Sequence, residues 1–500
     1  MNFNVILRSL GILLMLLGAS MCGCLLIGET IPREKTVMSV NYQGWLTSIA
    51  VTIGTGALGY FVGRRGILHN EKRGTDADPN GFRVLRREAI AIVGLGWLVC
   101  SAFAALPYLL CLSDVGYDKA FFESCSGLTT TGSTIFPTVE DLPKTVLCWR
   151  SLTQWLGGMG ILGAFLLIFS GETKGKTLLS FESSIHGSDL SSTNVRNAMR
   201  NLWRIYIILT AVCMLGLWMM DMTFFQAFNH SLTTTSTGGF GTENDSLTSF
   251  SPQVKSWVTF FMLGCGISFP LYMGLWKRRS IAVLKRHEET RWYLIFIAVA
   301  VSAIMVDKCL GLCDVSFLDA LFNVVSIITT TGFAVGDYGT WSVFSQQVIL
   351  LLMIIGGCSG STAGGLKVSR IVLWMRSLKN EVIRGFRPNI VLRLKMNGNP
   401  VSDDVGRSVF VVISFAVFFL ITGSLAVRIL EPEISTLACV SSVLTCLSNV
   451  GPAFDQLGPT ENFSQLSSGT LSFLSVLMVL GRLEYIAVLV LFSRRLWKKY

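Results

Sequence analysis

The chain carries little charge for its size. Only 14% of its 500 residues are Asp, Glu, Lys or Arg, whereas an ordinary soluble domain has roughly 25%. Hydrophobic residues make up 51%, and the mean hydropathy is +0.57. The length alone would suggest about three domains, but this composition excludes a series of soluble domains. It indicates a chain whose solvent is largely lipid.

Residue patterns typical of metal and nucleotide sites are also scarce. The chain has four histidines, and its thirteen cysteines are scattered through apolar segments without metal-ligand spacing. No P-loop sequence occurs. The Gly-x-Gly-x-x-Gly pattern at Gly54–Gly59 lies inside an apolar run, so it indicates close helix packing and not a dinucleotide site. We therefore expect no enzyme and no cofactor bound by this chain, and any nucleotide control must come from a partner.

Ten apolar segments are long enough, or nearly so, to cross a hydrocarbon layer of about 30 Å. Nine contain no charged residue, and the tenth contains only Arg482 and Glu484. The shorter segments from Ile205 and Trp292 can span if a terminal charge reaches the interface. The expected spans are Ser9–Gly28, Thr36–Gly63, Ala89–Ser113, Ser151–Gly171, Ile205–Met220, Ser256–Trp276, Trp292–Val306, Tyr338–Leu366, Ser408–Val427 and Leu471–Phe492. An even number predicts that both termini lie on the same side.

The charges between these segments alternate in sign. Basic residues gather in the stretches 64–87, 174–200, 277–286, 367–407 and 494–499. The alternate loops carry mostly acids, namely Asp114, Asp118, Glu123, Glu140, Asp141, Glu243, Asp245, Asp314, Asp319, Asp337, Glu431, Glu433, Asp455 and Glu461. The positive-inside rule places the basic stretches and both termini in the cytoplasm. The net charge of +10 is then a topology signal, not a sign of nucleic-acid binding, and the basic loops can meet anionic lipid or an acidic cytosolic partner.

A short Thr-rich element ending in glycine occurs four times, at intervals of about a hundred residues. Its copies end at Gly132, Gly239, Gly332 and Gly451. Alignment on these glycines extends upstream: position −12 holds the small residues Ala120, Ala227, Ala320 and Cys439, and position −6 holds the hydroxyl residues Ser126, Thr233, Ser326 and Thr445. The pattern predicts residues 1–87 as an N-terminal two-helix segment and four repeats at 88–200, 201–290, 291–405 and 406–500.

Each repeat reads as a long span, a segment of about a dozen residues, the Thr/Gly element, an acidic stretch and a second long span. A dozen residues cannot cross as a helix, so the segment must re-enter from the outer side. Non-helical backbone at membrane depth is tolerated where it lines water or is buried in protein. Four such loops around one axis would line a pore, and their carbonyl oxygens would replace the water of a cation. The alternative is four Thr-rich outer turns without a shared axis.

A ten-residue Gly-rich stretch interrupts the second span of the third repeat. It runs Gly356, Gly357, Cys358, Ser359, Gly360, Ser361, Thr362, Ala363, Gly364 and Gly365, with Lys367 just beyond. So many glycines cannot sustain a straight helix, and broken helices near the midplane commonly serve transport. The alternative is a helix face of small residues used for close packing.

These features together resemble the Trk/Ktr/HKT potassium-uptake superfamily, in particular its TrkH branch. The resemblance rests on the four repeats, the Thr-Thr-Thr-Gly elements, the Asn449-Val450-Gly451 variant and the Gly-rich stretch, and it covers essentially the whole chain. It implies an all-α polytopic membrane protein with two N-terminal helices and four helix, pore-loop, helix repeats around a pseudo-fourfold central pore. It also implies a potassium-translocating subunit in the bacterial inner membrane, usually a homodimer, controlled by a cytosolic nucleotide-binding protein of the TrkA type.

The resemblance also implies roles for particular residues. In that family a filter glycine in every repeat accompanies a preference for potassium, and this sequence has all four. The expected potassium filter consists of Thr130, Thr131, Gly132, Thr237, Gly238, Gly239, Thr330, Thr331, Gly332, Asn449, Val450 and Gly451. The Gly-rich stretch and Lys367 would form an intramembrane loop that gates the pore beneath this filter.

Arg482 stands near the middle of the last span, where a charge costs on the order of 3 kcal/mol to insert. We expect it to project into the pore as an electrostatic barrier near the gating loop. The alternative is a buried ion pair with an acid on another helix. Glu484 is a poor partner within the same helix, because it lies two positions away.

A protease interpretation of the Gly-rich stretch has little support. Residues 357–360 match the Gly-x-Ser-Gly sequence of rhomboid-type intramembrane proteases, but a serine nucleophile needs a base. No histidine lies in a span that would place an imidazole beside Ser359; the four are His69, His186, His230 and His287. A voltage-gated channel is disfavoured as well, since no span has Arg or Lys at every third position.

Two transport mechanisms remain open from the sequence. One is a channel-like potassium pore with a partner-controlled gate, and the other is a symporter that moves potassium with a proton or sodium. Carboxylates deep within spans would favour the coupled mechanism, and the candidates are Asp307 and Glu484.

Overall fold

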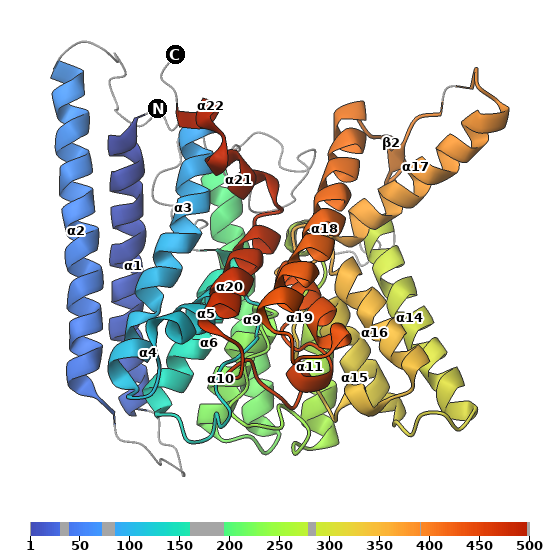
Figure 1. Ribbon diagram of the computed structural model, residues 1–500, viewed down its shortest axis with the longest axis horizontal. Coiled ribbons are helices and arrows are strands. Elements are labelled where there is room, and N and C mark those ends of the chain that lie inside the picture. Colours follow the sequence, from blue (N-terminus) through green and yellow to red (C-terminus); the bar gives the residue numbers. More distant parts are fainter. Residues whose placement is uncertain are drawn as a thin grey trace.

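The computed structural model describes residues 2–30, 40–72, 86–160, 195–278, 287–390 and 392–497. Helices dominate these residues, as the sequence predicts, and the strands among them are confined to a small antiparallel hairpin of β1 (Lys395–Met396) and β2 (Asn399–Pro400). Its Asn397-Gly398 turn has φ of 51° and 79°, as a two-residue hairpin turn requires. The start of α1, the C-terminal α22 and this hairpin lie at the same end of the molecule (Figure 1).

Six helices of the described part of the chain are long and apolar enough to cross a membrane. They are α1 (Phe3–Thr30), α2 (Tyr42–Lys72), α3 (Arg86–Ala104) with its continuation α4 (Leu106–Cys111), α9 (Val195–Met219), α14 (Glu288–Cys309) and α18 (Asp403–Leu430). Large apolar side chains such as Phe61, Val299 and Ile429 are exposed on their outer faces. Such exposure suits a lipid environment, in which apolar side chains need no protein cover.

The pair α1 and α2 confirms the packing interpretation of the glycine pattern at 54–59. A Cβ atom added to Gly56 would lie 2.8 Å from the carbonyl oxygen of Gly11, and one added to Gly11 would lie 2.5 Å from that of Gly56. The two backbones therefore approach as closely as glycine allows, which is typical of helix contacts in membranes.

Four short helices precede the four glycines. They are α5 (Tyr117–Leu128), α10 (Phe224–Thr235), α15 (Phe317–Ile328) and α19 (Thr436–Ser448). At 1.5 Å per residue they are about 18–20 Å long, too short to cross, as the sequence predicts. Side chains of Thr223, Ser316 and Ser435 cap the first turns of the last three, so each start is encoded locally.

The second helix of each repeat is also short. These helices are α6 (Lys144–Met159), α11 (Pro252–Cys265), α16 (Val343–Ile355) and α20 (Ser468–Arg482). The remaining elements are α12 (Phe269–Arg278), α17 (Val368–Phe386), α21 (Ile486–Leu489), α22 (Arg494–Trp497) and the 3-10 turns η1 (Tyr338–Thr340), η2 (Asp455–Leu457) and η3 (Val490–Phe492).

The structure corrects two expected spans. The run Ser256–Trp276 is broken, because α11 and α12 meet at 91°; the N–H of Phe269 bonds the carbonyl of Gly360 instead of continuing the helix. The run Leu471–Phe492 is broken after Arg482, because Glu484 and Tyr485 have φ of 56° and 64°. The run Tyr338–Leu366 is interrupted at the Gly-rich stretch, as predicted. The run Ser151–Gly171 continues beyond Gly160 outside the described residues.

Candidate functional site

The four short helices end in the same backbone motif. The residue two positions before each glycine is left-handed: φ is 53° at Thr130, 54° at Thr237 and Thr330, and 55° at Asn449. The N–H of the next residue then bonds the carbonyl at position −6, over 2.8–3.0 Å in all four repeats. This 6→1 bond defines a Schellman helix end. It turns each chain away from the helix toward its glycine. The hydroxyl at −6 holds the turned segment in three copies: Ser126 and Ser326 donate to the carbonyl just after their glycine (2.6 Å each), and Thr445 accepts the N–H of Gly451 (2.8 Å).

The turned segments bring the four predicted glycines into one closed ring. A Cβ on Gly132 would lie 2.3 Å from the carbonyl oxygen of Gly238, and one on Gly239 would lie 1.9 Å from that of Thr331. The series continues from Gly332 to the carbonyl oxygen of Val450 (2.0 Å) and from Gly451 to that of Thr131 (2.7 Å). Each glycine thus abuts the residue just before the next glycine, in chain order, and the last closes on the first. We call this set the glycine ring.

Positive φ reinforces the need for glycine in this ring. The φ values are 89° at Gly132, 81° at Gly239, 82° at Gly332 and 114° at Gly451. Side chains are strained in this region. Because the four helix C-termini converge here, their partial negative charges face the same small volume.

A polar residue nine positions before each glycine holds the chain beyond the glycine in three repeats. Glu123 accepts the N–H of Ile135 (2.9 Å), His230 bonds Thr242 (3.1 Å), and Asn323 exchanges two hydrogen bonds with the backbone of Val335. The bonded residue is always the third after the glycine. In the fourth repeat the neighbouring Ser441 bonds the equivalent Phe454 (3.1 Å).

Glu123 corrects an expectation from the sequence. It was grouped with the acids of the outer loops, but its side chain is fully buried and pairs with Arg150 at 2.8 Å. The Arg150 guanidinium also lies 4.2 Å from the ring centre of Phe240, the residue after Gly239, and donates to the carbonyl of Gly241. This ion pair therefore joins the loops of the first and second repeats behind the glycine ring. Because the Glu123 carboxylate is paired, it adds no free negative charge to the outer loops.

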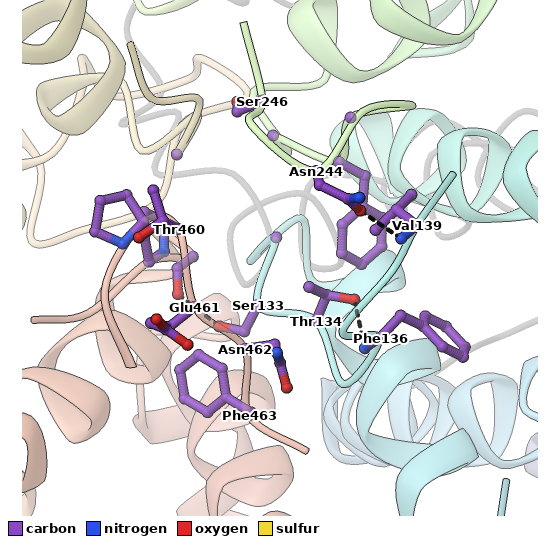
Figure 2. Close-up of a pocket in the computed structure, with 18 of the residues that line it drawn as sticks. Ser133, Thr134, Phe136, Val139, Asn244, Ser246, Thr460, Glu461, Asn462 and Phe463 are labelled. Carbon is purple, nitrogen blue, oxygen red and sulfur yellow. Dashed lines mark hydrogen bonds between the residues drawn. The ribbon is translucent and has the colours of Figure 1, made fainter. Parts of the chain in front are cut away.

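A small cavity of about 100 Å³ opens above the glycine ring and is lined by all four glycines. Figure 2 shows segments of the different repeats surrounding it, with Ser133, Asn244 and Glu461 among the labelled residues. Ser133 donates to the carbonyl of Gly451 (2.7 Å), which ties the first loop to the fourth. Glu243 and Glu461 also line the cavity, so acids stand close to the ring on this side.

The Gly-rich stretch lies directly against the inner ends of the same loops. The N–H of Gly364 donates to the hydroxyl of Thr330 (2.6 Å), and that of Gly365 to the carbonyl of Ser448 (2.9 Å). The hydroxyl of Thr362 reaches the carbonyl of Thr235 (3.3 Å). Positive φ at Gly356, Gly360 and Gly365 lets the backbone fold back on itself. We call residues 356–367 the intramembrane loop.

Arg482 lies next to this loop. It donates to the carbonyls of Thr362 and Gly157, each at 3.0 Å, and so links the loop to the end of α6. Lys367 is buried and donates to the carbonyl of Ala363 within the loop. Glu484 pairs with Arg370 on α17 at 2.5 Å.

Sequence reasoning missed several residues that support the site. Gln154 on α6 bonds both Gly238 and Phe240 and holds the second loop, and Glu289 on α14 bonds the intramembrane loop. The sequence does carry a signal for the pair of Glu123 and Arg150. Glu123 is a charged residue within the short segment before Gly132, and Arg150 directly precedes the apolar run from Ser151. Gln154 and Glu289 carry no comparable signal, because their partners come from other repeats or a distant loop.

Comparisons with known proteins agree on one family. A family model described as TrkH, a cation transport protein, matches residues 77–499. The Trk system potassium uptake protein TrkH of Halomonas elongata is 32% identical over 508 residues, with 100% of both chains covered. The protein of the same name from Escherichia coli is 31% identical over 422 residues, which covers 83% of this chain and 86% of the other.

A solved structure agrees as well. The crystal structure of the potassium transporter TrkH from Vibrio parahaemolyticus matches the whole of this chain with a TM-score of 0.84 and 27% identity, and all of that chain is covered. The likeness is therefore not confined to one part of the chain.

Proposed function

Because the chain belongs to the TrkH family of cation transport proteins, we propose that it is the potassium-translocating subunit of a bacterial Trk-type uptake system. Membership in a transport family bears out the expectation that the chain is not an enzyme, and potassium is its substrate, not a cofactor. The chain is a multi-pass membrane protein. We place it in the inner membrane with both termini cytoplasmic, following the charge pattern of the loops.

The observation that carries this proposal is the glycine ring. An ion that leaves water needs oxygen ligands in its place, and backbone carbonyls can supply them. In the ring, the carbonyls of Gly238, Thr331 and Val450 each lie against the ring glycine of the preceding repeat, and the carbonyl of Thr131 lies against Gly451. We assign the potassium filter to these residues, to the four glycines and to Thr130, Thr237, Thr330 and Asn449. Each of the four proposed repeats contributes one quarter of the filter; they are residues 88–200, 201–290, 291–405 and 406–500. Residues 1–87 form the N-terminal two-helix segment.

We assign the gate to the intramembrane loop, including Lys367, together with Arg482. The loop is hydrogen-bonded to the inner ends of the second, third and fourth filter segments, and Arg482 ties it to the first repeat. In this position it blocks the way from the filter to the other side. A positive Arg482 beside the path would also oppose cations. We further propose that the protein acts as a homodimer, under a cytosolic TrkA-type nucleotide-binding protein that docks on its basic face.

Coupled symport is the alternative mechanism. It would require a carboxylate in the ion path that exchanges protons. Asp307 accepts hydrogen bonds from the hydroxyls of Ser342 and Ser345, and Glu484 pairs with Arg370, so both candidates hold structural contacts.

Ion flux through the purified protein in liposomes tests the proposal. Uptake of potassium, rubidium, sodium and lithium would be compared with the proton gradient clamped. We expect potassium and rubidium to pass best without a proton gradient, and Gly132→Ser to relax the discrimination against sodium. Flux that requires a proton gradient would favour the symporter, and an unchanged ion ranking in Gly132→Ser would contradict the filter assignment.

A further inference from the structure

Glu289, in the first turn of α14, holds the intramembrane loop. Its side chain is only 4% exposed. One carboxylate oxygen accepts the N–H of Ser359 in the loop (2.7 Å) and the N–H of Ser369 in the first turn of α17 (3.1 Å). The hydroxyls of Ser359 and Ser369 are 2.5 Å apart as well. Charge-assisted bonds of this kind are stronger than neutral ones, so Glu289 holds the loop at Ser359 and ties it to the start of α17.

The preceding residue, Glu288, holds a different part of the molecule. Its carboxylate pairs with Arg376 of α17 and accepts the N–H of Asn397 at the tip of the β1–β2 hairpin (2.9 Å). Its own N–H donates to the side chain of Asn397 (2.8 Å). Arg376 also donates to the carbonyl of Lys395 in the same hairpin. Glu288 therefore binds the hairpin, which lies at the end of the molecule that carries the chain termini (Figure 1).

We propose that Glu288 and Glu289 form a relay that couples the hairpin to the intramembrane loop. The two residues share one turn of a helix, so a displacement of the hairpin moves the carboxylate that positions the loop. Coupling needs an element with two arrangements. In this proposal the loop is that element, and Gly356 and Gly365, whose φ values are 75° and 73°, are its hinges, because glycine adopts φ of either sign at little cost. Glu289 is a positioning residue here. The relay rests on the proposed function, in which this loop gates potassium.

The test uses the full-length protein in liposomes with two measurements, rubidium uptake and the rate at which a maleimide labels Cys358. Cys358 lies in the loop and is fully buried, so its labelling reports loop opening. Glu289→Ala removes both bonds, and we expect uptake and labelling to rise about tenfold, the factor that corresponds to about 1.4 kcal/mol. Glu289→Gln keeps an acceptor oxygen, so its increase should be smaller. Glu288→Gln loosens the hairpin and should raise labelling in the same direction.

Matched variants separate the relay from general damage and from the gate itself. Asp307→Asn alters a buried carboxylate at the far end of the same helix, which bonds Ser342 and Ser345, and it should leave Cys358 labelling at the wild-type rate. Gly364→Ala displaces the loop directly, because its Cβ would lie 2.3 Å from the carbonyl of Ser448. If Gly364→Ala raises uptake and Glu289→Ala does not, the relay is wrong while the gate stands.

Two further outcomes would also overturn the relay. Unchanged Cys358 labelling in Glu288→Gln would show that the hairpin does not act on the loop. If neither Gly364→Ala nor Glu289→Ala raises uptake, the proposed gate itself fails, and the relay fails with it. Should Glu289→Ala not fold, Glu289→Gln decides, because its labelling must then exceed that of the wild type.

Discussion

At the scale of single residues, the four ring glycines are not equivalent. A side chain at Gly239 or Gly332 would meet a carbonyl oxygen at 1.9 or 2.0 Å, at Gly132 at 2.3 Å, and at Gly451 at 2.7 Å. Contacts below 3 Å force the neighbouring atoms to move. The carbonyl that must move in each case is one that we assign to the filter, so the damage should follow these distances.

We therefore predict a graded loss of selectivity in the glycine-to-serine series. Gly239→Ser and Gly332→Ser should lower the preference for potassium over sodium by about tenfold or more, since about 1.4 kcal/mol of altered binding suffices. Gly451→Ser should have the smallest effect. The measurement is competition between sodium and rubidium for uptake in liposomes. Gly385→Ser on α17 is the control, because a Cβ there meets nothing within 4 Å. Equal losses at all four ring positions would contradict the ring geometry.

The buried Glu123–Arg150 pair gives a second prediction at this scale. Removing one partner of a buried ion pair leaves the other charge uncompensated and typically costs about 3–5 kcal/mol. Glu123→Gln should therefore lower the free energy of unfolding by about that much, and the double variant Glu123→Gln with Arg150→Met should recover part of it. Thermal unfolding in detergent measures both.

The control for this pair is the exposed ion pair of Arg384 and Glu381, whose side chains are 44% and 63% exposed. Because solvent screens such pairs, Glu381→Gln should cost less than about 1 kcal/mol. If the double variant were less stable than either single variant, the two side chains would not act as a compensating pair.

At the scale of elements, the sequence predicted the four short helices and the glycines well and the second helices poorly. The short helices carry local signals: caps at Thr223, Ser316 and Ser435, and small or hydroxyl residues at fixed distances from each glycine. The breaks after Cys265 and Arg482 occur in apolar runs that look continuous. Gly266 and Pro270 are a local signal for the first break, but the bend is fixed by a distant partner, the carbonyl of Gly360 that accepts the N–H of Phe269.

The residues of the candidate site also divide into those that have a local sequence signal and those that depend on distant partners. The ring glycines and the Gly-rich stretch were predictable because glycine is required by backbone shape at those positions. Glu123 was misplaced among the outer acids, since only the fold brings Arg150 to it. The hairpin at 395–400 was not predicted, although its Asn397-Gly398 turn is a known local signal.

The intramembrane loop yields a prediction at the element scale. Gly364→Ala inserts a methyl group between the loop and the carbonyl of Ser448, which it would approach to 2.3 Å. We expect the loop to move away and the closed state to lose about 1 kcal/mol of stability, which would raise rubidium uptake several-fold. The order of ion preference should stay the same. Gly385→Ala, in open space, is the matched control. A changed ion order with unchanged rate would assign Gly364 to the filter and not to the gate.

At the scale of the whole molecule, basic and acidic residues gather at opposite ends of α14. Glu288 at one end of α14 contacts the hairpin, and Cys309 at the other end is exposed; 22 residues of helix separate the two ends by about 33 Å. Basic residues such as Arg384, Arg387 and Arg393 accompany the hairpin. The acids Asp314, Asp319 and Asp337 line a cavity at the Cys309 end.

This arrangement predicts the orientation of the chain, because basic residues remain on the cytoplasmic side. In intact cells a membrane-impermeant maleimide should label native Cys309, and it should label an Arg387→Cys variant only after the membrane is permeabilised. Mass spectrometry of the labelled peptides distinguishes these sites from the other cysteines, and Cys309→Ser provides the background. Labelling of residue 387 in intact cells would place the hairpin outside, where no cytosolic protein can reach it, and would remove the basis for control of the intramembrane loop from that face.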